Sequence, residues 1–130
     1  MISAALPDDL RRFILSSIAS VPHLEALLLL HATPEQAWES LAVSQRLYVS
    51  EYVAQKLLDE LCAVGMLSKI DSVKSSKYCF QPSQPEFAEL ISRLAKAYRR
   101  DLVGISRLIH SQTDRQAQQF ADAFIWRKDV

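Results

Sequence analysis

The sequence is poor in glycine, with only two among its 130 residues. Glycine readily adopts the positive φ angles that tight turns need, so this scarcity excludes a fold made of many short hairpins. Leucine and alanine, which favour helix, are plentiful instead. With 49% hydrophobic residues there is also enough apolar material for one compact core. We therefore expect a mainly helical (α+β) chain.

Neither sign of charge is in excess, because 15 basic residues balance 15 acidic ones. The whole molecule is therefore not a polycation, and any binding to nucleic acid has to come from local patches. Long apolar runs are also lacking. The longest, residues 26–30, is far shorter than the roughly 20 residues that span a bilayer, so we expect no membrane partner.

Cysteine and histidine are too few and too scattered for a metal centre. Cys62 and Cys79 lack metal-ligand spacing, and His23, His31 and His110 have no ligand residue at a recognised spacing, so we expect no metal and no cofactor. No signal peptide is evident, which predicts reduced thiols in a cytoplasmic protein. The two thiols would form a redox sensor if they lay close together, but a structural role is the simpler interpretation.

Motifs of enzyme chemistry are also missing. The sequence has no glycine-rich phosphate loop, no Gly-x-Ser-x-Gly elbow and no carboxylate pair within a catalytic motif. It contains no internal repeat or low-complexity segment either. We therefore expect a binding protein and not an enzyme.

Capping residues predict where the first helices begin. Pro7-Asp8-Asp9 places a proline and two carboxylates in the first turn of a helix over residues 7–19. Ser20 and Pro22 begin a second helix, which ends at about residue 31. Thr33-Pro34-Glu35-Gln36 matches a capping box, so we expect a third helix over residues 33–42, followed by a polar link over residues 43–49.

The next segments predict a helix, a hairpin and a long helix. Ser50 is a plausible N-cap for a helix that runs to Val64 and ends at Gly65. Residues 66–82 contain two runs with β-branched and aromatic residues on either side of a polar tip, a pattern that indicates a β-hairpin. Capping boxes at residues 83–86 and 113–116 then predict a helix to about His110 and a terminal helix.

This order of elements resembles a winged helix-turn-helix. The resemblance is carried by the pair Leu41-Ala42, the turn Val49-Ser50, the series Ala54, Leu58, Leu61 and Gly65, the step Gly65-Met66-Leu67, and the strand Tyr78-Cys79-Phe80-Gln81-Pro82. Over residues 20–82 these features are similar to those of bacterial transcriptional regulators of the MarR and PadR kind. The stretch from Leu41 to Leu47 is longer than usual in such proteins, which predicts a remodelled turn.

The resemblance implies a domain organisation and a function. Residues 1–82 would form the winged helix-turn-helix domain, with an added N-terminal helix at 7–19, and residues 83–130 a helical dimerisation extension. Such proteins bind double-stranded DNA as homodimers. The recognition helix would be residues 50–64 and the wing residues 66–82.

Helical periodicity selects the side chains that would meet DNA. It turns Ala54, Leu57, Leu58, Leu61 and Val64 inward and leaves the polar residues of this helix outward. The first turns of a recognition helix meet base edges, where glutamine pairs with adenine and lysine with guanine. The candidate DNA-binding residues are Arg46, Ser50, Tyr52, Gln55 and Lys56 at the helix, and Lys69, Lys74 and Lys77 on the wing.

The charge of the recognition helix supports a second interpretation. Residues 50–64 carry Glu51, Asp59 and Glu60 against Lys56, a net charge of −2, whereas three lysines against Asp71 give the wing +2. Carboxylates beside a docked helix repel phosphates. The alternative is therefore a winged helix that docks on a transcription or signalling protein through this acidic face, although we favour DNA.

A wide apolar stripe on the last two helices predicts self-association. We expect a two-fold dimer, whose symmetry would match palindromic half-sites. Its interface would comprise Phe87, Ile91, Leu94, Tyr98, Leu102, Ile105, Ile109, Phe120 and Phe124. The alternative is that this stripe packs on the helix at residues 7–19 within one chain.

A small-molecule effector is a further possible partner, because regulators that the chain resembles often hold one between the DNA-binding lobe and the dimer helices. His31, Trp38 and Tyr98 are the candidates to line such a pocket. Packing in the core is the simpler account of these three residues.

Overall fold

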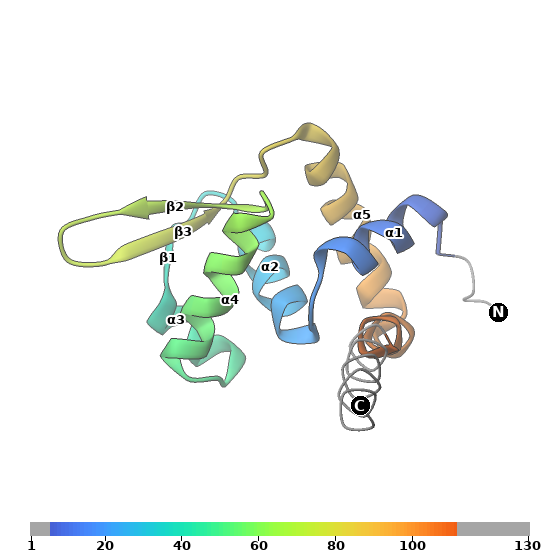
Figure 1. Cartoon of the computed structure of the whole chain (residues 1–130), viewed down its shortest axis with the longest axis horizontal. Coiled ribbons are helices and arrows are strands. Elements are labelled where there is room, and N and C mark those ends of the chain that lie inside the picture. The colour runs from blue at the N-terminus through green and yellow to red at the C-terminus, as the bar shows by residue number, and fades with distance from the viewer. Residues whose placement is uncertain (1–5, 112–130) are drawn as a thin grey trace, which may run out of the picture.

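A computed structural model of the chain describes residues 6–111 (Figure 1). Its elements are the helices α1 (Asp8–Ser17), α2 (Val21–Ala32), α3 (Ser40–Leu47), α4 (Glu51–Ala63) and α5 (Pro85–Arg100), and the strands β1 (Trp38–Glu39), β2 (Leu67–Asp71) and β3 (Ser76–Phe80). A further helical stretch covers residues 102–111. The expected mainly helical (α+β) class is confirmed. The predicted terminal helix, with Phe120 and Phe124, lies outside the described residues.

Local capping chemistry sets the ends of α2 and α4 as the sequence predicts. The hydroxyl of Ser20 accepts the backbone N–H of His23 at the start of α2, and the hydroxyl of Ser50 accepts that of Val53 at the start of α4. Helix α4 ends at Ala63, and Gly65, two residues later, has a φ of 86°. The N–H of Met66 then returns to the carbonyl of Leu61 at 3.0 Å, the hydrogen bond of a Schellman motif.

The predicted helix over residues 33–42 is wrong. The hydroxyl of Thr33 does not cap a new helix, because it donates to the carbonyl of Leu29 at the end of α2 and accepts the indole N–H of Trp38 at 3.0 Å. Residues 38–39 form β1 instead, and α3 begins only at Ser40. The expected polar link over residues 43–49 is therefore mostly helix. Leu41, expected to point inward, is 51% exposed.

The three strands form one antiparallel sheet in the order β1, β3, β2. Strands β2 and β3 are the predicted hairpin, paired from Leu67 with Phe80 to Asp71 with Ser76. Strand β1 adds the pair of Trp38 with Tyr78 on the other edge of β3. Figure 1 shows the hairpin extending away from the helices, at the end of the molecule that carries α3. The predicted wing is confirmed, and it has a third strand.

The predicted long helix over residues 86–110 is interrupted. Asp101 has non-helical backbone angles, and its carboxylate accepts the N–H of Gly104 at 3.0 Å, so Asp101 caps a separate helical stretch. The chain therefore changes direction after Arg100, as the orange end of α5 shows in Figure 1. This bend directs apolar side chains from both sides of the break into one core.

The break has a consequence for the expected dimer interface. Ile91, Leu94, Ile105 and Ile109 are each 0 or 1% exposed within a single chain and join the same core as α1 and α2. They are thus not free to meet a partner, which corrects the expectation for these four residues. Phe87 illustrates the alternative of packing within the chain, because its ring centroid lies 6.0 Å from that of Phe13 in α1. Leu102 remains 54% exposed.

No single helix among residues 6–111 is long and apolar enough to cross a membrane. Helices α1 and α2 satisfy the length and composition of a span only when they are joined, and the pair is bent by 110° at its break.

A bidentate ion pair ties α1 to α5. The guanidinium of Arg93 donates to both carboxylate oxygens of Asp9, at 2.8 and 2.9 Å. This hydrogen-bonded pairing lowers the pKa of Asp9 to about 2. In an unfolded chain an aspartate titrates near 3.9, so the folded form holds its ionised carboxylate more strongly.

We expect the Asp9–Arg93 ion pair to make the free energy of unfolding depend on pH. Because the folded pKa of Asp9 is the lower one, its stabilising effect is present above about pH 4 and is lost as the pH falls toward 2. Asp9→Asn should therefore be less stable than the wild type at about pH 5, and the gap should close at about pH 2. Urea denaturation across this range measures the difference. Asp8→Asn is the control, because Asp8 forms no ion pair with a described residue; an equal effect of both variants would contradict the prediction.

Candidate nucleic-acid interface

Helices α3 and α4 form the helix-turn-helix, joined by residues 48–50. Because α3 extends to Leu47, this turn is short, and the expected remodelling caused by a long link is not found. The inner side of α4 is fixed by Ala54, Leu57, Leu58 and Leu61, which are at most 6% exposed. Val64, also expected to point inward, is 42% exposed because it follows the last turn of the helix.

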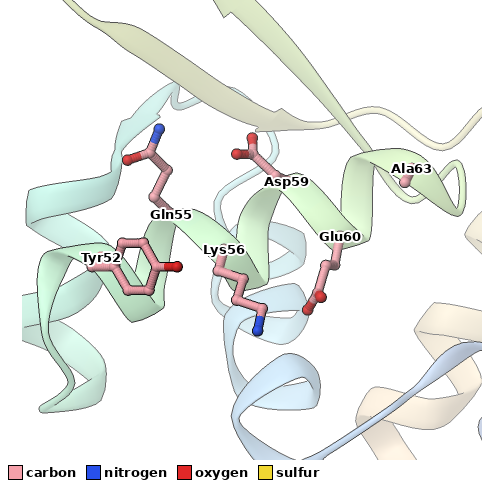
Figure 2. A pocket seen from close by; sticks show the side chains of 6 residues that line it. All are labelled: Tyr52, Gln55, Lys56, Asp59, Glu60 and Ala63. Atoms are coloured by element: carbon pink, nitrogen blue, oxygen red, sulfur yellow. The ribbon is translucent and has the colours of Figure 1, made fainter.

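The outward face of α4 carries the predicted recognition residues. Tyr52, Gln55, Lys56, Asp59, Glu60 and Ala63 line an open hollow of about 400 Å³. Figure 2 shows that Gln55 and Asp59 point toward the hairpin, whereas Lys56 and Glu60 lie on the side of α2. The predicted Tyr52, Gln55 and Lys56 are therefore together on one exposed helix. Ser50 lies at its start, where its hydroxyl is already the N-cap.

Asp59 joins α4 to the wing. One of its carboxylate oxygens accepts the hydroxyl of Tyr78 at 2.6 Å and the ammonium of Lys69 at 3.2 Å. The Lys69 ammonium also lies 5.6 Å from the ring centroid of Tyr78. Burial and the Asp59 hydrogen bond raise the pKa of Tyr78, and the same carboxylate raises the pKa of Lys69. Lys69 therefore neutralises Asp59 and is not a free cation on the wing.

The other two carboxylates of α4 also have partners. Glu60 lies 2.7 Å from the imidazole Nε2 of His23 on α2, and Glu51 accepts the hydroxyl of Ser40 on α3 at 3.5 Å. Glu51 is in the first turn of its helix, where the positive end of the helix dipole favours a carboxylate. The acidic residues of α4 therefore fasten this helix to its neighbours.

The remaining candidate cations are exposed. Lys56, Lys74 and Lys77 form no side-chain hydrogen bond or ion pair with another residue between 6 and 111. Lys74 lies at the tip of the hairpin. Lys77 is in β3, where its backbone lies opposite that of Glu39 in the register of β1 and β3. Arg46 is in the last turn of α3, with its guanidinium carbon 5.5 Å from the Trp38 ring centroid. Arg46 and Lys56 are thus on the two helices of the helix-turn-helix, and Lys74 and Lys77 are on the wing.

Tyr48, in the turn between α3 and α4, is exposed beside the candidate interface and is not among the residues predicted from the sequence. Its side chain is 94% exposed and its φ is 59°, so it projects into solvent beside the start of the recognition helix. The predicted polar link contained this residue. The sequence predicts a helix that ends at residue 42, whereas α3 ends at Leu47. With the helix end at Leu47, Tyr48 is its C-cap and not part of a link.

The two cysteines are not joined by a disulfide, and the surroundings of Cys62 disfavour thiol reactivity. Both are free thiols, Cys62 on α4 and Cys79 on β3. Burial, with a further contribution from the Asp59 carboxylate, raises the pKa of Cys62 to about 11. A thiol that stays protonated at neutral pH is a poor nucleophile, so the structural interpretation is favoured over the redox sensor.

The three residues considered for an effector pocket make different contacts within the chain. Trp38 is buried in the sheet beside Thr33. His31 on α2 contacts Ser92 at 3.2 Å and meets the ring of Phe80 edge-on, and burial lowers its pKa. Tyr98 is half-buried on α5 against the core. Packing accounts for each of them.

Comparison with known proteins identifies the fold. No protein-family model matches the chain, and no curated protein is similar to it in sequence. Similar solved structures include MepR of Staphylococcus aureus, a transcription regulator of the multidrug efflux pump MepA, which is 11% identical over 89% of this chain and 87% of MepR with a TM-score of 0.54. A MepR–DNA complex is 8% identical over 87% and 86% of the two chains, with a TM-score of 0.56.

A further similar structure is the homodimeric winged helix-turn-helix DNA-binding domain of Mb0332 from Mycobacterium bovis, a possible ArsR-family transcriptional regulator. It is 16% identical over 78% of this chain and 94% of that domain, with a TM-score of 0.53. At such low identities, what is shared is the arrangement of the elements. This chain therefore has the winged helix-turn-helix fold.

Proposed function

We propose that this protein is a DNA-binding transcriptional regulator that acts as a homodimer in the cytoplasm. Helix α4 is its recognition helix in the major groove, and the β2–β3 hairpin is its wing on the DNA backbone. The fold shared with a MepR structure that contains DNA and with the homodimeric Mb0332 domain supports this proposal. The observation that carries it is the engagement of the α4 carboxylates by the protein itself.

The charge of the recognition helix opposes DNA less once its ion pair with the wing is counted. Lys69 neutralises Asp59, which brings the net charge of residues 50–64 from −2 to −1, and the carboxylates of Glu60 and Glu51 contact His23 and Ser40. The cations left to meet DNA are Arg46, Lys56, Lys74 and Lys77. Four phosphate contacts per subunit predict a salt slope of about −3 to −4 per subunit.

The homodimer in this proposal uses the C-terminal part of the chain, residues 83–130. Of the expected interface residues, Phe87 and Tyr98 are half-buried and Leu102 is 54% exposed, with Val103 beside it at 57%. To enter successive turns of the major groove, the two recognition helices of such a dimer have to lie about 34 Å apart, one turn of DNA.

The alternative function, docking of a protein on the acidic face of α4, requires carboxylates that are free to bind. Asp59 already accepts two hydrogen bonds from the wing, and Glu60 contacts His23. A partner would have to displace these contacts, so the geometry favours DNA.

Charge reversal at Lys56 tests the proposal. Lys56→Glu puts a carboxylate on the outward face of α4, so we expect at least a tenfold loss of DNA affinity and a salt slope that is less steep by about 1 per subunit. The measurement is fluorescence anisotropy with a duplex from upstream of the protein's own gene, at several salt concentrations.

Arg12→Glu is the matched control, because Arg12 is an exposed cation on α1, outside the helix-turn-helix and outside residues 83–130. This variant should bind like the wild type. Binding that does not depend on salt, or equal losses in the two variants, would contradict the proposed function.

A further inference from the structure

Tyr48 adopts a backbone conformation that is costly for its residue type. Its φ of 59° and ψ of 42° are left-handed, and it is the only non-glycine residue with positive φ among residues 6–111. Its N–H bonds to the carbonyl of Ser44 and so ends α3. Glycine, or sometimes asparagine, is the usual occupant of such a position, because it avoids the clash of Cβ with the backbone.

The fold gives no reason for a tyrosine here. The side chain is 94% exposed, and it makes no hydrogen bond or ring contact with another residue of the described part of the chain. It therefore adds nothing to packing that would offset the backbone strain. Strained residues that the fold itself does not require occur preferentially at functional sites.

The position of Tyr48 indicates what it contacts. It lies two residues before Ser50, the N-cap of α4, and α4 is the helix that enters the major groove in the proposed function, on which this inference rests. Arg46, in the last turn of α3, is an exposed cation at the same end of that helix, with its guanidinium over the Trp38 ring. An exposed cation and an exposed phenol hydroxyl at one helix end suit an anionic partner.

We propose that Tyr48 is a DNA-contacting residue, whose hydroxyl donates a hydrogen bond to a backbone phosphate beside the recognition helix. Tyrosine is among the side chains that make such contacts, which fix the register of a protein on the duplex. The left-handed turn holds the side chain clear of the protein surface, so that it reaches the phosphate while α4 lies in the groove. The contact is uncharged and releases no counterion.

Two variants test the hydroxyl and the backbone separately. The probe is a labelled duplex of about 30 base pairs from upstream of the protein's own gene, long enough for two half-sites one turn apart. Tyr48→Phe keeps the ring and the strain, and should lower affinity about tenfold, because hydrogen bonds to charged groups are the stronger ones. Its salt slope should equal that of the wild type, unlike that of Lys56→Glu.

Tyr48→Gly removes the ring and relieves the strain. It should weaken DNA binding at least as much as Tyr48→Phe, while its thermal denaturation midpoint stays the same or rises by about 2 to 5 °C. Loss of binding together with equal or higher stability is not expected of a residue with a merely structural role. Arg12→Gln, which changes an exposed side chain on α1, outside both the helix-turn-helix and residues 83–130, is the control and should bind normally.

The outcomes distinguish this inference from the proposed function. If the wild type binds the duplex and both Tyr48 variants bind equally well, Tyr48 does not contact DNA and the proposed function stands. A lowered denaturation midpoint in Tyr48→Gly would assign the residue to the fold and overturn the inference. If the wild type shows no salt-dependent binding, the proposed function and the inference fail together.

Discussion

Trp38→Ala is expected to lower the free energy of unfolding by about 3 to 5 kcal/mol, the usual cost of removing a large buried aromatic side chain. Trp38 is only 4% exposed and belongs to the core that joins the sheet to the helices. Its backbone pairs β1 with Tyr78 of β3, and this pairing is unchanged by the substitution. Loss of the indole would leave a cavity and remove the hydrogen bond to Thr33.

Urea denaturation followed by circular dichroism measures this effect. Thr33→Val is the informative companion, because it removes only the hydroxyl that accepts the Trp38 indole N–H and should cost about 1 to 2 kcal/mol. Trp38→Phe should fall between the two, since it keeps an aromatic ring in the core. A loss below about 1 kcal/mol for Trp38→Ala would contradict the burial of this residue.

Thr33 also explains why one helix was predicted in the wrong place. A capping box is a local signal over four residues, and Thr33-Pro34-Glu35-Gln36 fits it. In the folded chain the Thr33 hydroxyl is taken by Leu29 and Trp38, so it is not available to cap a helix. Trp38 is held there by its pairing with Tyr78, a partner 40 positions along the sequence that no local pattern specifies.

The elements that were predicted well depend on local chemistry. Ser50 and Gly65 bound α4 through one side-chain cap and one positive φ, and both can be read from residue type. The hairpin follows from alternation around a polar tip. The interruption at Asp101 was missed as a helix end because an aspartate is compatible with a helix interior as well as with an N-cap.

The candidate site was predictable in its residues but not in its charge. Helical periodicity placed Tyr52, Gln55 and Lys56 on the outward face of α4, where they lie. The contacts of Asp59 with Lys69 and of Glu60 with His23 depend on how α4 packs against β2 and α2. These contacts follow from tertiary packing, so no local pattern of residues predicts which carboxylate is paired with a cation.

Gly65 occupies the junction of the recognition helix, the wing and α5. Its φ of 86° ends α4, and its carbonyl accepts the N–H of Ser83 at 2.8 Å, just before α5. A Cβ atom on this residue would lie 2.5 Å from the Ser83 hydroxyl oxygen and 3.5 Å from the ring of Phe87. Both the backbone angle and the space at this position therefore select glycine.

Gly65→Ala should lower the free energy of unfolding by about 2 to 4 kcal/mol, from the left-handed backbone and the clash together. The double variant Gly65→Ala/Ser83→Ala removes the clashing hydroxyl, so it should regain part of this loss and keep the part caused by the backbone. Ser83→Ala alone is the control and should change stability little, because Ser83 is exposed. Urea denaturation of the four proteins gives both contributions. If the double variant is as stable as the wild type, the backbone angle carries no cost; if it is no more stable than Gly65→Ala, the contact with Ser83 carries none.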